Sequence, residues 1–241
     1  MKHPCSACRP PPKWSRQSLR KASSPSPGSK LRCGGSELPA KRYSGRSVSE
    51  GDEAFIAASA RFISAFSILD EIAAKGERLL LFVDDLGIHA RLTGLIQRRY
   101  GLSAAPMVIN GTVAGSSRQA RVDRFQTAAD GFDAMILSPR AGGVGLTLTR
   151  ANHVLHLSRW WNPAVEDQCN GRALRIGQTR KVTLHIPLAT LSSSRGRSFD
   201  QNLHALLERK HRLMHEALLP PEATESERKQ LLQESLAGAR G

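Results

Sequence analysis

Two short segments of the sequence combine residue types that suit phosphate chemistry. The first, Ser138 to Leu146, holds three glycines within four positions, Gly142, Gly143 and Gly145. Glycines let a backbone approach a ligand closely and turn its amide groups toward phosphate oxygens. A sharp structural turn is the alternative, and for a glycine cluster alone it is the favoured one, because such loops are common after strands.

The second segment, Gln168 to Gln178, contains Arg172 and Arg175. On a helix their spacing of three puts both guanidinium groups on one face. Two planar cations that point the same way suit a polyphosphate, and an arginine that meets the charge developing on a transferring phosphoryl group accelerates the transfer. The alternative is a solvated basic face, which is where an isolated arginine pair usually lies.

The elements that must position these segments alternate between buried-strand and amphipathic-helix patterns. Strands are expected at residues 79–83, 107–109, 135–137, 154–157 and 182–186. Helices are expected from a cap at Asp52 to Gly76, around 86–96, around 118–125, from Pro163 through Ala173, and at 199–218. The alternation predicts one α/β domain over residues 51–219, with a parallel sheet covered by helices on both faces. Such sheets place ligands at the carboxyl ends of their strands.

The two ends of the chain differ in composition from this domain. Residues 1–50 hold 7 of the 13 prolines, and 11 Lys and Arg against 2 acidic residues, a surplus of 9 out of the net +14. They are predicted to be a disordered basic leader. The polar residues 220–241 are predicted to be a tail that frays. In the last expected helix, Lys210 is expected to point outward with Arg209 and Arg212.

Cysteine content and hydropathy point to a cytoplasmic setting without a membrane. Four cysteines are too few for a disulfide framework in 241 residues. Cys5 and Cys8 with His3 and Cys33 could supply zinc ligands, but no second pair completes a recognised spacing, so no metal site is predicted. No apolar run approaches the roughly 20 residues that cross a bilayer.

The phosphate-suited segments resemble two helicase motifs when they are taken together. Leu137 to Leu146 resembles motif V of superfamily 2 helicases, and Gln168 to Gln178, with its "RIGQ" ending, resembles motif VI in its Swi/Snf form. Three further stretches are similar to family elements: Leu80 to Val83 to motif IV, Asn110-Gly111 with Arg118 and Phe125 to the "G … R … F" segment, and Trp160 to Ala164 to the "WNPA" element. The resemblance covers about residues 60–215 and implies the second RecA-like lobe of an ATP-dependent DNA translocase.

The resemblance also implies roles for particular residues near the nucleotide. Arg172 and Arg175 would be arginine fingers that reach ATP, with Mg²⁺, held mainly on a first lobe. Gln178 would support that interface, and Gly143 and Gly145 would shape the loop that couples nucleotide to DNA.

A second set of residues would serve double-stranded DNA. Ser138 and Arg140 would face its backbone, where contacts position a protein without reading sequence. Gly111 belongs to the same predicted grip. For Trp161, packing and capping are favoured over a DNA role, because a Trp before Asn-Pro more often packs beside a helix start.

Two departures from the family pattern and one absence leave alternatives open. Gly171 stands where the family commonly has an acid and Leu174 where it has His, which indicates a divergent, bacterial-type branch or the loss of part of the coupling network. No G-x-x-x-x-G-K-[ST] loop occurs. The first lobe is therefore expected in trans or lost by truncation, and the chain alone is predicted to be inactive. The alternatives are a non-catalytic DNA- or protein-binding module and an inactive remnant of a truncated gene.

Overall fold

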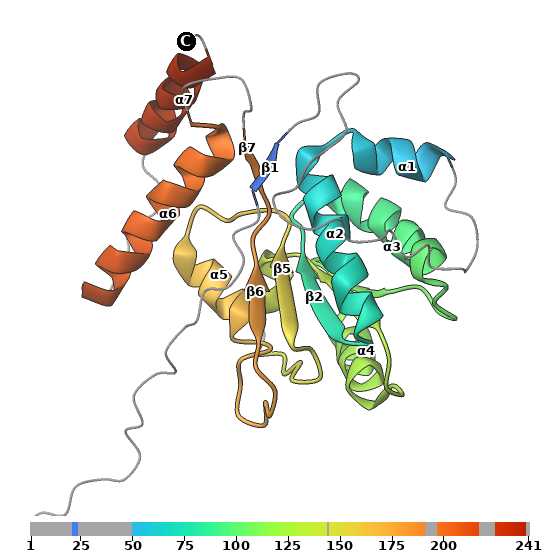
Figure 1. Ribbon diagram of the computed structural model, residues 1–241. Helices are drawn as coiled ribbons and strands as arrows, with labels where there is room; N and C mark the ends of the chain where they lie inside the picture. The colour runs from blue at the N-terminus through green and yellow to red at the C-terminus, as the bar shows by residue number, and fades with distance from the viewer. Residues whose placement is uncertain (1–20, 24–49, 144, 191–196, 217–224, 240–241) are drawn as a thin grey trace, which may run out of the picture.

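The computed structural model describes residues 21–23, 50–143, 145–190, 197–216 and 225–239. The candidate zinc ligands and most of the predicted leader lie outside these residues. Five parallel strands form the main sheet in the order β3-β4-β2-β5-β6 (Figure 1). Their bounds are Arg78–Phe82 for β2, Met107–Ile109 for β3, Asp133–Leu137 for β4, His153–His156 for β5 and Thr183–His185 for β6. Each overlaps a strand that the sequence predicts.

Helices cover both faces of this sheet, which confirms the predicted fold class. In the central strand β2, Leu79 and Leu81 pack in one cluster with helices α2 (Ala60–Ala74) and α3 (Leu86–Tyr100). Leu80 and Phe82 point the opposite way, into a second cluster with α4 (Gly115–Thr127) and α5 (Pro163–Asn170). Because side chains alternate along a strand, a fully apolar run is buried on both faces. Each such side chain contributes about 1.5–3 kcal/mol by leaving water.

Local signals set where several helices begin and end. Asp85 caps α3 by accepting from the amides of Gly87 at 2.7 Å and Ile88 at 3.2 Å, and Gly101 ends it with φ of 62°. A left-handed residue at this position favours glycine, which has no Cβ to clash. Helix α4 ends on the guanidinium of Arg78, which donates to the carbonyls of Phe125, Ala128 and Ala129. The carbonyls at the end of an α-helix have no amide donors within the helix, and Arg78 supplies donors for them.

The prediction of one helix from Asp52 to Gly76 is wrong. Helix α1 (Glu50–Ala57) and α2 are separated at Ser59, whose φ of −142° and ψ of 123° are extended. Asp52 is not a cap either, since it is 1% exposed and accepts from Arg98 at 2.7–2.9 Å. A buried carboxylate needs such a partner, and this ion pair fixes α1 against α3.

The two predicted irregular ends contain structure. Residues 21–23 form β1 (Lys21–Ser23), which pairs in parallel with β7 (Leu188–Thr190). Residues 225–239 form α7 (Glu225–Ala239), and its Leu231 packs with Leu203 and Leu207 of α6 (Phe199–Glu216). The leader and tail predictions are therefore wrong for these stretches, because a partner distant in sequence supplies the apolar or hydrogen-bonding surface.

The outward orientation predicted for Lys210 is also wrong. Lys210 is 2% exposed, and its Nζ lies 3.2 Å from a carboxylate oxygen of Glu227 on α7. Arg209 and Arg212 are exposed as predicted. Among the described residues, no helix combines the length and the apolar character that a membrane span needs.

Candidate functional site

The glycine-rich segment begins at the carboxyl end of β4. The amide of Ser138 donates to the carbonyl of Ile109 at 3.0 Å, which extends the pairing of β4 with β3 and buries the Ser138 side chain. Residues Arg140–Gly143 then form a single 3₁₀ turn, which contains Gly143, and Arg140 is exposed. Of the two residues expected to face a DNA backbone after β4, the structure exposes only Arg140.

Arg175 joins the other end of this segment. Its Nη1 donates to the carbonyls of Gly145 at 2.8 Å and Leu146 at 3.2 Å. A Cβ added at Gly145 would lie 3.4 Å from Nη2 and 3.5 Å from Nη1 of Arg175, which are ordinary van der Waals distances, so the guanidinium packs directly on the backbone of this segment. Arg175 is exposed, and within the described part of the chain its Nη2 and Nε donate to no acceptor. An anion therefore has access to this guanidinium.

Arg172 does not share the open position of Arg175, and the prediction that both lie on one helical face is wrong. Helix α5 ends at Asn170, and Arg172 follows it with 5% of its surface exposed. The α-helical pattern stops here because the amides of Arg172 and Ala173 donate to carbonyls three residues earlier in the chain instead of four. The Arg172 carbonyl in turn accepts a hydrogen bond from the amide of Leu148 at 2.9 Å. Burial lowers the pKa of Arg172 below its ordinary value, and repulsion from Arg175 acts in the same direction.

Gln178 ties the second segment to the chain that leads into β5. Its Nε2 lies within hydrogen-bond distance of three carbonyls, those of Thr149 at 2.9 Å, Ala151 at 2.8 Å and Ala173 at 3.1 Å. Its Oε1 accepts from the amide of Arg180 at 3.0 Å. One amide side chain thus holds the turn that carries Arg175.

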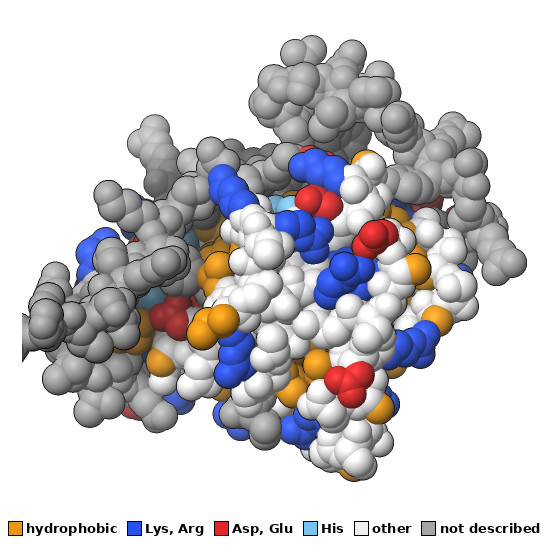
Figure 2. Space-filling view, turned by 90° about the horizontal axis from the view of Figure 1, so that it is seen from below, with side chains coloured by type: hydrophobic (Ala, Val, Ile, Leu, Met, Phe, Trp, Pro, Cys, Tyr) orange, Lys and Arg blue, Asp and Glu red, His pale blue; other side chains and the backbone are white. Residues whose placement is uncertain are grey.

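This junction lies at the amino ends of the strands, whereas the sequence pattern predicted ligands at the carboxyl ends. The loops that lead into β5 and β6 are at the lower end of the molecule in Figure 1. Figure 2 looks at that end and shows Lys and Arg side chains interspersed with acidic ones. The ion pair of Arg150 with Asp130 at 2.7 Å is one such pairing. Arg175 and Gln178 therefore lie at the end of the sheet opposite to Arg140.

The carboxyl ends of the strands carry the other predicted residues. Gly111 is exposed in the loop after β3, where the Asn110 side chain accepts from the amide and the hydroxyl of Thr112 at 3.1 and 2.7 Å. β3 and β4 are neighbours, so Gly111 and Arg140 share one edge of the sheet. From the loop after β5, the Trp160 ring reaches Arg140, whose Cζ lies 4.9 Å from the ring centroid.

Trp161 is placed differently from its neighbour. It packs against the cluster of Leu203, Leu207 and Leu231 between α6 and α7. Asn162 then caps α5 by accepting from the amide of Ala164 at 3.0 Å, with Pro163 as the first helical residue. This is the packing and capping arrangement that the sequence favoured for Trp161.

Comparisons with known proteins agree with this geometry. Residues 64–177 match the model of the helicase conserved C-terminal domain. The chain is 33% identical over 164 residues to YwqA of Bacillus subtilis (strain 168), named as an ATP-dependent helicase/translocase, and this alignment covers 68% of the chain and 17% of YwqA. It is 36% identical over 147 residues to the Zorya protein ZorD of Escherichia coli O139:H28, covering 59% of the chain and 13% of ZorD.

A solved structure of a related ATPase also resembles this chain. The Sulfolobus solfataricus SWI2/SNF2 ATPase core in complex with dsDNA aligns with 26% identity and a TM-score of 0.52, over 66% of this chain and 31% of that one. The matched residues form a C-terminal lobe of the Swi/Snf type. The described domain is a helicase C-terminal domain of the kind found in SNF2-like translocase ATPases, with the predicted RecA-like fold. The chain spans less than a fifth of the length of the two curated relatives.

The Swi/Snf lobe also contains a buried ion pair that sequence reasoning missed. Arg159 and Glu166 are 7% and 8% exposed, and Glu166 accepts from Arg159 Nε at 2.7 Å and Nη2 at 3.0 Å. Burial alone would raise the pKa of Glu166, but the attraction of Arg159, followed by that of His156, lowers it below its ordinary value. The one available signal was an acid in the first turn of a Pro-started helix seven residues after an arginine.

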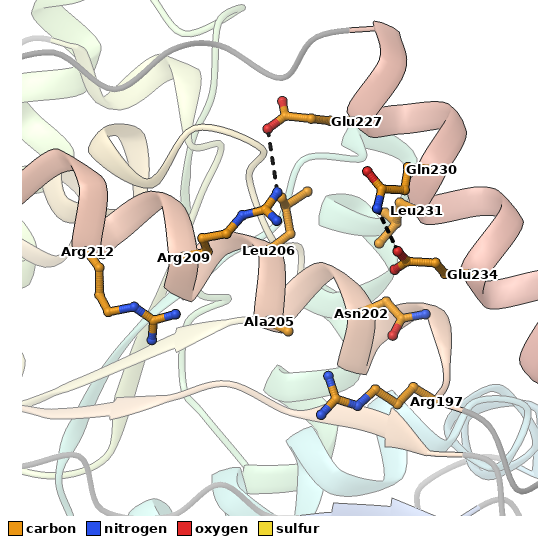
Figure 3. A pocket seen from close by; sticks show the side chains of 10 residues that line it. All are labelled: Arg197, Asn202, Ala205, Leu206, Arg209, Arg212, Glu227, Gln230, Leu231 and Glu234. Carbon is orange, nitrogen blue, oxygen red and sulfur yellow. Dashed lines mark hydrogen bonds and ion pairs between the residues drawn. The ribbon is translucent and has the colours of Figure 1, made fainter.

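A groove between α6 and α7 of the Swi/Snf lobe holds none of the predicted site residues. It has a volume of about 260 Å³, and Figure 3 shows its arginines on or beside α6 and its acids on α7. Arg209 lies 3.9 Å from Glu227, and Gln230 donates to Glu234 at 2.8 Å. These pairs join the two helices or stabilise α7.

Proposed function

We propose that this lobe is the second motor domain of an ATP-dependent DNA translocase and that Arg175 acts as its arginine finger. The observation that carries the proposal is an exposed guanidinium held on the glycine-rich segment by two main-chain carbonyls, with Nη2 and Nε still open. An arginine in such a position stabilises charge that develops during phosphoryl transfer. The name of YwqA as an ATP-dependent helicase/translocase supports the same activity.

The residues of this lobe fit a nucleotide that another lobe holds. ATP with Mg²⁺ supplies the phosphoryl group whose transfer drives the motor. The cationic Arg175 suits the polyphosphate, while the acidic ligands of Mg²⁺ and the phosphate-binding loop belong, in this proposal, to a first lobe. Closure of the two lobes brings Arg175 to the nucleotide and excludes water.

The other predicted nucleotide residues act through Arg175. Arg172 is too buried to reach a ligand on another lobe in this arrangement, so its proposed role is to fasten the Arg175 turn to Leu148 through its carbonyl. Gln178 fastens the same turn from the other side. Gly143 and Gly145 have no side chains of their own, so the backbone at these two positions is proposed to pass a movement of Arg175 on to Arg140.

The DNA grip is proposed at the carboxyl edge of the sheet. Arg140 and Gly111 are exposed there in neighbouring loops, and a basic side chain beside a bare backbone suits phosphate contacts. Ser138 would support this DNA grip indirectly, because its pairing with β3 fixes the start of the segment that carries Arg140. Trp161 would support it by packing its loop against α6 and α7. The structure neighbour in complex with dsDNA supports duplex DNA as the partner.

Reconstituted hydrolysis tests the finger assignment. The chain is mixed with a separately purified first lobe of a Swi/Snf relative, and DNA-stimulated ATP hydrolysis is measured. Arg175→Ala is expected to lower the rate by about 10³-fold, the size typical of a lost arginine finger. Arg180→Ala, in the same exposed loop, is the matched control and should keep the wild-type rate. A wild-type rate in Arg175→Ala would overturn the assignment.

The alternative of a non-catalytic DNA-binding module is favoured by one observation, the basic composition of the first residues. Residues 1–20 hold five Lys and Arg and no acidic residue. If this segment supplied the DNA affinity, its deletion would abolish a salt-sensitive interaction with duplex DNA. The motor proposal expects the deletion to leave reconstituted hydrolysis at the wild-type rate.

A further inference from the structure

Two adjacent tryptophans of the loop after β5 lie in different surroundings. Trp161 packs with leucines of α6 and α7, whereas the Trp160 ring carries the guanidinium of Arg140 at 4.9 Å. No hydrogen bond or ion pair joins Arg140 to another described residue, so the ring is what the guanidinium contacts. Trp160, not Trp161, therefore faces the edge where the DNA grip is proposed.

We infer that Trp160 is a positioning residue of the DNA grip, a platform whose ring holds the Arg140 guanidinium in place for a backbone phosphate. The buried Arg159–Glu166 pair fixes the position of this platform. The inference rests on the proposed function and names residues that the family resemblance did not assign. A guanidinium over an aromatic face is attracted by the ring while its N–H groups remain free at its edge. Those N–H groups are the ones that a phosphate accepts from.

The Glu166 carboxylate fixes the main chain of the platform. Its Oε1 accepts from the Trp160 amide at 3.0 Å, in addition to the two bonds from Arg159. Hydrogen bonds to a charged group are stronger than neutral ones, and burial strengthens them further. The backbone at Trp160 is therefore held by a carboxylate that cannot move without leaving Arg159 buried and unpaired.

A further bond connects the platform to helix α6. Nη1 of Arg159 lies 2.9 Å from Nδ1 of His204. A guanidinium only donates, so Nδ1 must accept, and His204 carries its proton on Nε2. Helix α6 is thus fastened to the loop that carries Trp160, and the platform keeps one position relative to the sheet.

Equilibrium binding to a short duplex at several salt concentrations tests this inference. Arg140→Ala is expected to lower affinity and to reduce the slope of log affinity against log salt by about 0.9, the value for one phosphate contact. Trp160→Leu is expected to lower affinity by about 2- to 5-fold, the size of an exposed cation–π contact. Trp160→Phe keeps a ring and should recover most of this loss.

The decisive comparison is a double-mutant cycle. If the ring acts only through Arg140, Trp160→Leu has no further effect in the Arg140→Ala background. Glu166→Gln, which keeps shape but loses charge, should weaken binding in the same direction and also lose its effect when Arg140 is absent. Arg212→Ala, an exposed arginine of α6, is the charge-matched control, and circular dichroism of each variant checks the fold.

The outcomes separate this inference from the function beneath it. Additive losses in Arg140→Ala and Trp160→Leu would overturn the platform while leaving DNA binding in place. The same holds if Trp160→Phe binds as weakly as Trp160→Leu. Wild-type protein that shows no salt-dependent affinity for the duplex would overturn both the platform and the proposed grip.

Discussion

Arg175 and Arg140 are exposed arginines at the two ends of one glycine-rich segment, and they are held by different chemistry. Carbonyls of Gly145 and Leu146 hold Arg175, with Gln178 fastening the turn beside it. The Trp160 ring holds Arg140, and the buried Glu166 carboxylate fixes the main chain of Trp160. The first end is built from amides and a guanidinium, which do not change charge near neutral pH. The second depends on a buried carboxylate, Glu166, which lies beside the ionisable side chain of His156.

The difference indicates how each end responds to a ligand. Carbonyl acceptors can be exchanged for phosphate oxygens at little cost, so a nucleotide bound as proposed could draw Arg175 away from Gly145. The Arg140 end is instead preorganised, because its supporting ion pair cannot be exchanged without exposing a buried charge. The proposed nucleotide end is therefore expected to move and the proposed DNA end to keep its shape.

Removing the Gln178 amide is the largest expected perturbation of the first end. Gln178→Leu keeps the volume but loses two N–H donors, which three carbonyls share, and the Oε1 acceptor of the Arg180 amide. At about 1 kcal/mol for each of these groups the free energy of unfolding should fall by about 3 kcal/mol. Urea denaturation measures this. Gln119→Leu removes an exposed bond to Asp123 on α4 and should change stability by less than about 0.5 kcal/mol. Equal effects of the two variants would mean that Gln178 does not hold the turn.

Acidification is expected to act on the second end. Burial lowers the pKa of His156, which bonds Asn170 at 2.8 Å beside Glu166. A histidine with a lowered folded pKa contributes its full stability above its ordinary value of about 6.5 and loses it as pH falls from there toward the folded value. The Glu166 carboxylate, whose pKa is also lowered, keeps its contribution until lower pH.

Urea denaturation from pH 7 to pH 5 checks this sign. The free energy of unfolding of the wild type should fall over this range, and His156→Gln should flatten part of the fall. His153, whose pKa burial also lowers, accounts for a further part. A profile in His156→Gln as steep as that of the wild type would place the pH dependence elsewhere.

The smallest expected effect on stability concerns Gly145. In Gly145→Ala the new Cβ meets the end of the Arg175 side chain at 3.4 Å, an ordinary van der Waals distance, so the guanidinium can keep its place. Stability should change by less than about 0.5 kcal/mol. Reconstituted hydrolysis should also stay close to the wild-type rate, because the added Cβ does not displace the Arg175 guanidinium. Gly115→Ala, where a Cβ meets nothing within 4 Å, is the control and should leave hydrolysis unchanged.

The fold could be predicted because its signals are local. The run Leu79 to Leu81 is apolar at every position, which a strand buried on both faces requires, and Pro163 after Asn162 marks a helix start. The site could be predicted only in part. The end of α5 before Arg172 depends on Leu148, whose amide reaches the Arg172 carbonyl from a distant segment. No pattern in one helix contains that contact.

The tryptophan pair shows the same limit at a single site. Trp160 and Trp161 are identical neighbours in sequence, and the positions of Arg140, α6 and α7 distinguish them. Helix α7 itself has a weak apolar stripe, so its order depends on packing of Leu231 against α6 rather than on its own residues. Contacts between distant segments are what sequence patterns leave undetermined.

Arg78 has a consequence for how the lobe assembles. It is the first residue of the central strand, yet it supplies the donors for the end of α4 about 50 residues later. The last turn of α4 has donors for these carbonyls only when β2 is in place. Unfolding of β2 would remove those donors and leave the carbonyls without hydrogen-bond partners. The centre of the sheet and α4 should therefore fold and unfold as one cooperative unit, and a protease should find no separately frayed end of α4 to cut.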